Sequence, residues 1–331
     1  MEQRKTTNRR TIVPVGRAWA SRRLPAKPRH ILVGTLLPIG DTLMATPAIA
    51  GLRRRFPEAI ITAWVSASNA AILEGNPDID QLVRMPTMQG WKNLREIAHA
   101  VRELRAANID LIINLAGASS MLSRAYLPTV PRMFLDASPW WFLRGSDERY
   151  RARHSVDQYF YAMAPYVGLP ATAQERLPRL TLSPDDMAQA AQALTDERIP
   201  SGKTLITMHV GGDGFDGRKQ WMPERFAAVG RALVDQYDAH ILLVGGPVDE
   251  AVARAVAARM PRNAHLLVGQ MPLRTTAALI RRAALHVGND SAPMHMAAAV
   301  GTPAIGIFGP SNWEQFTPVA VNPNAIRVLH S

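Results

Sequence analysis

Three short segments of the sequence combine glycine with charged or hydroxyl side chains: residues 38–42, 211–223 and 288–295. Glycine allows the backbone to approach a ligand closely, and lysine or the amides at a helix N-terminus can hold a phosphate. A carboxylate in such a segment can accept a proton from a hydroxyl group. Together these residue types predict a site that binds an anionic ligand and moves a proton.

The carboxylate of the first segment is Asp41, which stands between Gly40 and Thr42 where a predicted strand gives way to a helix. Two interpretations stay open from the residues alone. Aspartate is a common helix N-cap, so Asp41 can have a purely local role. It can also act as a general base that faces a cleft.

The second segment contains Gly212, Gly214 and Gly217, which match the spacing G-x-G-x-x-G after a predicted strand. In a dinucleotide-binding fold the helix opens within these glycines, whereas here Pro223 marks the first turn of the next helix. The spacing therefore argues against a nicotinamide dehydrogenase. For Lys219 two interpretations stay open: a residue of a flexible surface loop, or a point charge that binds a phosphate.

The third segment places Asp290, Ser291 and Ala292 between a predicted strand and the helix that follows it. Either Asp290 or Ser291 can cap this helix, and Pro293 suits its first turn. The amides and the dipole of the same helix end also favour a diphosphate, so capping and binding are compatible. His295, one turn into the helix, is more typical of a packed histidine than of a catalyst.

Strands alternate with helices twice along the chain, and these elements position the three segments. The predicted strands are short apolar or β-branched runs at 31–34, 60–65, 110–115, 205–210, 241–244, 266–268, 285–287, 304–308 and 325–329. Alternating β and α units predict an α/β fold with two doubly wound parallel-sheet domains that face a cleft. In such domains ligands bind at the carboxyl ends of strands, where the three segments lie.

Turn residues around positions 184–202 separate the two series of strands. We therefore divide the chain into a basic arm (1–30), an N-terminal domain (31–180), a linker region (181–202) and a C-terminal domain (203–331). Each of the two domains is Rossmann-like, so nucleotides and their diphosphates are the expected occupants of the cleft.

Composition excludes several classes of protein. Hydrophobic residues make up 47% and charged residues 20% of the 331 residues, as in an ordinary globular protein, and no apolar run is long enough to cross a bilayer. Cysteine is absent, which removes disulfides and thiolate chemistry. No His, Asp and Glu set has metal-ligand spacing, and no G-x-S-x-G segment predicts a serine hydrolase. We expect neither a metal nor a cofactor.

The formal net charge of +11 is concentrated at the N-terminus. Residues 1–30 hold nine Lys or Arg and one Glu, a net +8, so the rest of the chain carries only +3. Because residues 31–331 carry so little net charge, the sequence does not predict a nucleic-acid-binding protein. We expect the arm to be disordered and drawn to an anionic membrane surface.

The three segments, in this order, resemble the ADP-heptose:lipopolysaccharide heptosyltransferases of glycosyltransferase family 9. The motifs that carry the resemblance are Gly40-Asp41-Thr42-Leu43 with Thr46-Pro47-Ala48, Lys219-Gln220-Trp221 with Pro223, and Asn289-Asp290-Ser291-Ala292-Pro293-Met294-His295 followed by Gly301-Thr302-Pro303 and Phe308-Gly309-Pro310-Ser311. Each motif alone is modest, but the ordered set is specific.

The resemblance implies a GT-B fold and an inverting, metal-independent transfer of heptose from ADP-heptose to the inner core of lipopolysaccharide, at the cytoplasmic face of the inner membrane. It implies that Asp41 is the catalytic base and that Lys219 stabilises the leaving diphosphate. The implied donor-binding residues are Gly212, Lys219, Asp249, Glu250, Asp290, Ser291, Ala292 and His295, and the implied acceptor-side residues are Gly40 and Thr42.

Two departures from the family pattern affect these expectations. Ala292 stands where many relatives have glycine and is similar to the third-heptose branch, which leaves the acceptor sugar open. Relatives also continue beyond the position of Ser331, so the resemblance implies a C-terminal domain that is cut short. The alternatives are another GT-B nucleotide-sugar transferase, an epimerase, an inactive truncated relative and a basic nucleic-acid-binding protein. We expect a monomer.

Overall fold

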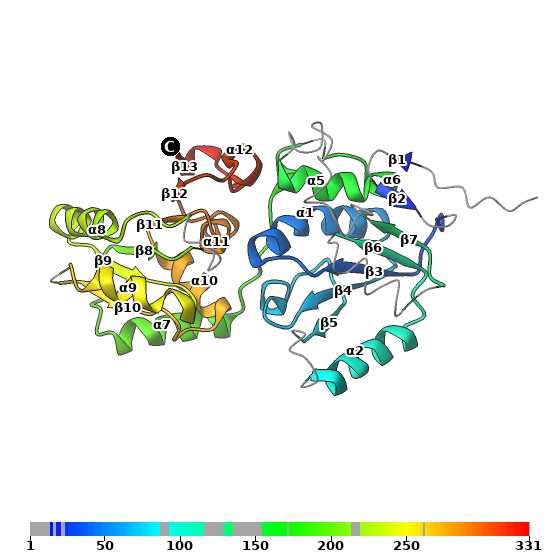
Figure 1. The fold of residues 1–331 in the computed structure, drawn as a ribbon, viewed down its shortest axis with the longest axis horizontal. Coiled ribbons are helices and arrows are strands. Elements are labelled where there is room, and N and C mark those ends of the chain that lie inside the picture. The colour runs from blue at the N-terminus through cyan, green and yellow to red at the C-terminus, as the bar shows by residue number, and fades with distance from the viewer. Residues whose placement is uncertain are drawn as a thin grey trace, which may run out of the picture.

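The computed structural model describes residues 14–15, 18–20, 24–86, 93–115, 127, 129–134, 154–170, 172–212, 219–260 and 262–330. These residues form two lobes, each built on one β-sheet with helices against it (Figure 1). The predicted class, two doubly wound α/β domains, is confirmed.

The N-terminal lobe contains a seven-stranded sheet in the order β1-β2-β7-β6-β3-β4-β5. Its strands are β1 (Pro14–Val15), β2 (Ala18–Ala20), β3 (His30–Thr35), β4 (Ile60–Ser66), β5 (Gln81–Met85), β6 (Leu111–Asn114) and β7 (Arg132–Phe134). Strands β3 to β7 pair in parallel, whereas β1 and β2 pair antiparallel at one edge. The prediction that residues 1–30 are wholly disordered is therefore wrong for β1 and β2, because β2 completes the open edge of β7.

Helices cover both faces of this sheet, as the predicted βα alternation requires. They are α1 (Ile39–Arg55), α2 (Leu94–Ala106), α5 (Ser155–Ala162) and α6 (Ala164–Val167), with short 3₁₀ turns η1 (Ala70–Ile72) and η3 (Gln174–Arg176). Successive side chains of β3 point to opposite faces. Ile31 and Val33 pack in a core with residues of α1 and α5, whereas Leu32 packs in a separate core with residues of α2.

The C-terminal lobe contains a six-stranded, fully parallel sheet in the order β10-β9-β8-β11-β12-β13. Its strands are β8 (Leu205–His209), β9 (His240–Leu243), β10 (Ala264–Leu266), β11 (Leu285–Asn289), β12 (Ala304–Phe308) and β13 (Ile326–His330). All six strands begin and end within two residues of a predicted run, and β10 has the largest shift, two residues earlier at both ends than its run at 266–268.

The helices of this lobe are α7 (Pro184–Asp196), α8 (Pro223–Tyr237), α9 (Glu250–Ala257), α10 (Leu273–Arg282), α11 (Ala292–Val300) and α12 (Trp313–Phe316), with 3₁₀ turns η4 (Pro247–Asp249) and η5 (Pro323–Ala325). Helix α7 occupies most of the region that we predicted to be a linker. Ser183 and Asp186 form a capping box at its start. Its Ala190 and Leu194 pack with Leu242 and Leu279 of the C-terminal lobe, so α7 is part of that domain.

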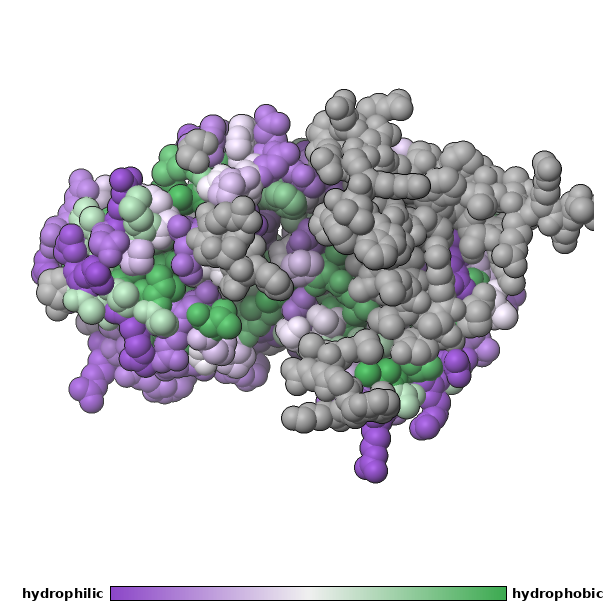
Figure 2. All heavy atoms as spheres, viewed as in Figure 1, coloured by the Kyte–Doolittle hydropathy of each residue, from purple (hydrophilic) through white to green (hydrophobic). Residues whose placement is uncertain are grey.

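The two lobes share one apolar cluster. Leu43 of α1 and Ile72 of η1 are almost fully buried with Ile280 of α10 and Met294 of α11. In the space-filling view, hydrophobic residues line the recess between the lobes, while the outer surface of the C-terminal lobe is largely hydrophilic (Figure 2). Apolar burial therefore holds the two domains against each other beside the cleft.

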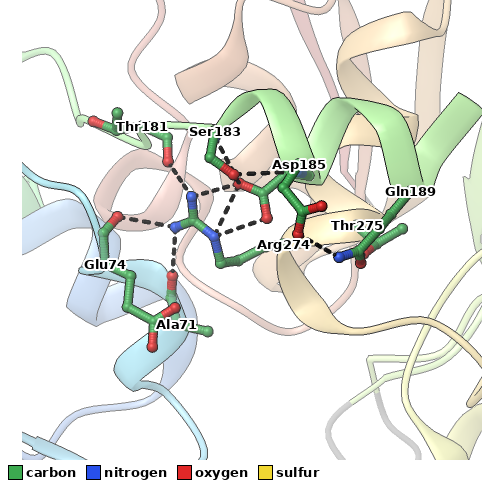
Figure 3. A network of polar contacts seen from close by, with 9 residues as sticks. Ala71, Glu74, Thr181, Ser183, Asp185, Gln189, Arg274 and Thr275 are labelled. Carbon is green, nitrogen blue, oxygen red and sulfur yellow. Dashed lines mark hydrogen bonds and ion pairs between the residues drawn. The ribbon is translucent and has the colours of Figure 1, made fainter.

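Arg274 of α10 adds a polar connection between the lobes (Figure 3). Its guanidinium donates to the backbone oxygens of Ala71 at 3.0 Å and Glu74 at 2.9 Å in the N-terminal lobe, and to Thr181 O at 2.7 Å. It also binds the Asp186 carboxylate at 2.6 Å. Although burial opposes this shift, the bonds from Arg274 and Ser183 lower the pKa of Asp186 to about 2. Asp186 therefore stays ionised beside Arg274.

Candidate active site

The predicted site residues, except Thr42 and Glu250, line one cleft of about 650 Å³ between the lobes. The N-terminal wall is the start of α1, including Gly40 and Asp41. The C-terminal wall includes Gly212, Lys219, Asp249, Asp290, Ser291, Ala292 and His295. These residues follow the carboxyl ends of parallel strands, as the sequence predicts for a doubly wound fold.

Asp41 lies in the first turn of α1, and its carboxylate lines the cleft. The helix N-cap is Pro38, so the interpretation of Asp41 as an ordinary N-cap is wrong. Tyr159 of α5 donates a hydrogen bond to Asp41 Oδ1 at 2.8 Å. Burial raises the pKa of Asp41, whereas the Tyr159 bond and nearby Lys219 oppose that rise. The result is a partly buried carboxyl group with raised proton affinity, a property that suits a general base.

Lys219 of the second segment forms an ion pair with Asp290 of the third segment. Its Nζ lies 3.1 Å from Oδ2 of Asp290, which is almost fully buried. Asn289 holds the flanking backbone in place, because its amide donates to Gly211 O at 2.6 Å and accepts from Trp221 N at 3.1 Å. These bonds fix both ends of the loop that carries Lys219.

The N-terminus of α11 faces the cleft with Ser291 at the N-cap. The side chain of Ser291 makes no capping bond to this helix, so the capping interpretation is not supported for its hydroxyl. Instead Ser291 Oγ lies 2.9 Å from His209 Nδ1, and His209 Nε2 lies 3.3 Å from Asp249 Oδ2. Pro293 has no N–H and Met294 N donates to Ser291 O at 3.2 Å, so Ala292 N is the first-turn amide of α11 that can meet an anion in the cleft.

The structure separates the two candidate acids of the nucleoside site. Asp249 lines the cleft but is almost fully buried and accepts a bond from Gly246 N at 2.9 Å. A Cβ at Gly211 would lie 1.8 Å from Asp249 Oδ1, which explains glycine at that position. Glu250 is half-buried, pairs with Arg254 one turn along α9, and does not line the cleft. Only Asp249 is placed where it can meet a ligand.

His295 packs directly against the opposite wall of the cleft. A Cβ at Gly40 would lie 3.0 Å from His295 Cδ2, so the two walls touch here because residue 40 has no side chain. Burial lowers the pKa of His295 to about 4, and its Nδ1 has no hydrogen-bond partner in the described part of the chain. At neutral pH this imidazole is therefore uncharged, and its Nδ1 is buried.

Thr42 does not line the cleft, although we predicted it as an acceptor-side residue. It is fully buried, and its Oγ1 donates to Leu37 O at 3.3 Å.

Tyr159, His209 and Arg274 were not predicted from the sequence. A polar residue at the end of an apolar strand was the available signal for His209, but nothing local indicates that Tyr159 meets Asp41.

Among the described residues, no group of three or more His, Asp or Glu side chains is arranged to hold a metal ion. Within the same residues, no helix has the length and apolar character needed to cross a membrane.

Two parallel-sheet domains that face a cleft at the carboxyl ends of their strands have the GT-B architecture. A sequence profile of glycosyltransferase family 9 (heptosyltransferase) matches residues 97–331. The chain belongs to this family, as its motifs predicted.

Relatives and solved structures agree with the assignment. Lipopolysaccharide heptosyltransferase 2 of Escherichia coli K12 is 24% identical over 312 residues, 88% of this chain and 86% of that protein. Lipopolysaccharide heptosyltransferase 3 of the same strain is 26% identical over 300 residues, covering 84% and 83%. The fold matches E. coli ADP-heptose LPS heptosyltransferase II with a TM-score of 0.71 at 25% identity, covering 91% and 90% of the chains. A family 9 glycosyltransferase from Veillonella parvula matches with a TM-score of 0.74 at 23% identity, covering 91% and 87%.

Proposed function

We propose that this protein transfers a heptose from ADP-heptose to the inner core of lipopolysaccharide. The observation that carries the proposal is that Asp41 of one domain and Lys219 of the other face the same cleft. Glycosyl transfer is favoured by a base at the acceptor hydroxyl and by positive charge at the leaving diphosphate. Membership of the heptosyltransferase family and the names of the relatives support heptose as the sugar and ADP as the carrier.

The C-terminal wall has the features of a nucleoside diphosphate site. Lys219 and the N-terminus of α11 supply positive charge for the diphosphate. Val248, Met271 and Leu273 line the same cleft and offer apolar surface to a planar base. The acceptor then approaches from the N-terminal wall, where Asp41 lies.

The proposed reaction inverts the anomeric configuration without a metal. The acceptor hydroxyl attacks the anomeric carbon from the face opposite the diphosphate while Asp41 takes its proton. The bond from that carbon to the diphosphate oxygen breaks, and ADP leaves with the electron pair. Lys219 and the N-terminus of α11, with Ala292 N, stabilise the charge that grows on this oxygen.

Two substitutions test the separate roles. Asn at position 41 keeps the shape of the side chain but cannot take the proton, so Asp41→Asn should retain ADP-heptose binding and lose about 10²- to 10⁴-fold in kcat. Lys219→Ala should weaken donor binding and lower kcat by about 10²- to 10³-fold. Asp235→Asn and Lys203→Ala are controls, because both side chains are in ion pairs outside the cleft. Near-normal turnover of folded Asp41→Asn would exclude Asp41 as the base.

The donor experiment separates heptose transfer from the alternative GT-B activities. ADP-heptose, ADP-glucose, UDP-glucose and UDP-N-acetylglucosamine are compared by calorimetry and by transfer to a purified inner-core acceptor. We expect ADP-heptose to bind most tightly and to be the donor that is consumed. Preferred binding of a UDP-sugar, or interconversion of a UDP-sugar without transfer, would identify another transferase or an epimerase.

We also propose that the protein acts as a monomer at the inner face of the inner membrane. The net charge of +8 on residues 1–30 supports this location, because each basic residue near an anionic surface contributes about 1 kcal/mol. The full chain should bind phosphatidylglycerol-containing vesicles at low salt and dissociate at high salt. Neutralising Arg4, Lys5, Arg9 and Arg10 to Gln should reduce this binding. Unchanged binding would contradict the proposed role of the N-terminal segment.

A further inference from the structure

Tyr159 connects the helix α5 to the carboxylate of Asp41. Its hydroxyl donates to Asp41 Oδ1 at 2.8 Å, and its ring is 95% buried, with a relative exposure of 5%. Tyr159 packs in the same apolar core as Met44 and Ala48 of α1, the helix that carries Asp41. Because the ring is held by this core, the position of its hydroxyl is fixed relative to the carboxylate.

Tyr159 is the donor of this hydrogen bond and Asp41 is the acceptor. A tyrosine hydroxyl donates to a carboxylate and does not take a proton from the acceptor at neutral pH. The bond uses a lone pair of Oδ1 and restricts rotation of the carboxyl group, which makes Oδ2 the more accessible oxygen for a proton. We propose that Tyr159 is a positioning residue, which turns Asp41 Oδ2 toward the acceptor hydroxyl. This inference rests on the proposed role of Asp41 as the base.

In the described part of the chain, the other charged groups that act on Asp41 come from the opposite wall. Lys219 favours the ionised form of Asp41, Asp290 disfavours it, and burial disfavours it most strongly. His295 is uncharged at neutral pH, because burial lowers its pKa to about 4. Among the described residues of the N-terminal domain, Tyr159 is the one whose bond favours the ionised form of Asp41. Loss of this hydroxyl should raise the pKa of Asp41 further.

Tyr159→Phe removes only the hydroxyl and provides the test. We expect kcat to fall about 10-fold with little change in the KM for ADP-heptose, because the donor is bound by the other domain. The acidic limb of the kcat/KM profile should move to higher pH by about one unit, as expected when a bond to the ionised form is lost. A mere loss of packing or stability would not move this limb.

Tyr166→Phe is the matched control. Tyr166 lies on the next helix, α6, and its hydroxyl donates to Pro25 O at 2.9 Å, so it too loses one tyrosine hydrogen bond in the same domain. Its pH profile should match that of the wild-type protein. If Tyr159→Phe does not fold, 3-fluorotyrosine at position 159 replaces it. This residue keeps the hydroxyl as a stronger donor, so the acidic limb should move to lower pH.

The outcomes distinguish this inference from the proposed function. An unchanged pH profile in folded Tyr159→Phe, or in the fluorotyrosine protein, overturns the positioning role of Tyr159. If Asp41→Asn is inactive at the same time, the proposed role of Asp41 is retained. Full activity of Asp41→Asn would instead overturn the assignment of the base, whatever the result at position 159.

Discussion

Lys219 Nζ lies 3.1 Å from Asp290 Oδ2, so the cation expected to meet the diphosphate is paired with a carboxylate of its own domain. Lys219 follows β8 and Asp290 follows β11, and these strands are adjacent in the sheet. The pair therefore forms where two parallel strands end side by side. A diphosphate that binds Lys219 has to compete with Asp290 for it.

This competition gives a prediction for ADP affinity. Asp290→Asn removes a negative charge from the diphosphate site while it keeps the shape of the side chain, so ADP should bind about 5-fold more tightly. Isothermal titration calorimetry at low salt measures the change. Asp235→Asn, an exposed acid of α8, should leave the affinity unchanged. Weaker ADP binding by Asp290→Asn would show that Asp290 helps to hold the nucleotide.

The close approach of Gly211 to Asp249 predicts a severe effect of adding one methyl group. Gly211→Ala would place its Cβ 1.8 Å from Asp249 Oδ1 and displace a buried carboxylate. We expect a loss of about 1–3 kcal/mol in the free energy of unfolding, typical of overpacking. At Gly212 the Cβ would meet the flexible Gln220 side chain at 3.0 Å, so Gly212→Ala should cost less. Urea unfolding compares the two, and equal losses would contradict this explanation.

Removal of Arg274 should weaken the connection between the domains. Arg274→Ala leaves Asp186 buried without its cation and leaves the Ala71 and Glu74 carbonyls without their donor. Breaking a buried ion pair in this way costs about 3–5 kcal/mol. Arg254→Ala, which breaks an exposed pair on α9, should cost about 1 kcal/mol or less. Similar losses in chemical unfolding of the two variants would refute a special role for Arg274.

The buried imidazole of His286 predicts acid sensitivity. It is fully buried at the centre of the C-terminal sheet beside Thr207, and burial lowers its pKa to about 3. The unfolded chain takes up a proton near pH 6.5 and the folded protein does not. The stabilisation is therefore complete above pH 6.5 and is lost as the pH falls toward 3, with a slope of about 1.4 kcal/mol per pH unit.

His286→Gln should reduce this pH dependence of the free energy of unfolding by about one proton. The free energy is measured by urea titration at several pH values between 4.5 and 7.5. His99→Gln is the control, because His99 is exposed on α2. A pH dependence that is the same in His286→Gln and in the wild-type protein would mean that His286 does not cause the acid sensitivity.

The sequence predicts those strands and helices whose own residues form a characteristic local pattern. Strands β3, β4, β8 and β12 are continuous apolar or β-branched runs, and Pro223 begins α8 as its fixed φ favours. Strands β5 and β7 were missed because their runs, QLVRM and RMF, are short and include arginine. Pairing with β4 and β6 decides their conformation.

In the candidate site, too, the residues that the sequence predicts are those marked by a local pattern. Asp41, Lys219 and Asp290 were predicted because each follows a strand, and parallel strands bring such positions to one edge. The contact of Tyr159 with Asp41 spans 118 residues and depends on how α5 packs on α1. Its position is set by side-chain packing between two helices, which no pattern within either helix records.

The unequal connections between the two lobes have a consequence for how a substrate enters. On one side Arg274 bridges the lobes by several hydrogen bonds, and on the other His154 of the N-terminal lobe bonds to Thr317 O at 2.6 Å. A rotation that separated the lobes but kept the Arg274 bonds would break the His154 bond and expose part of the apolar cluster that the lobes share. Asp41 and Tyr159 travel together in such a motion, as do Lys219 and Asp290. Each lobe thus holds one pair of hydrogen-bonded side chains in a fixed arrangement. Closing the cleft only has to bring these two pairs together.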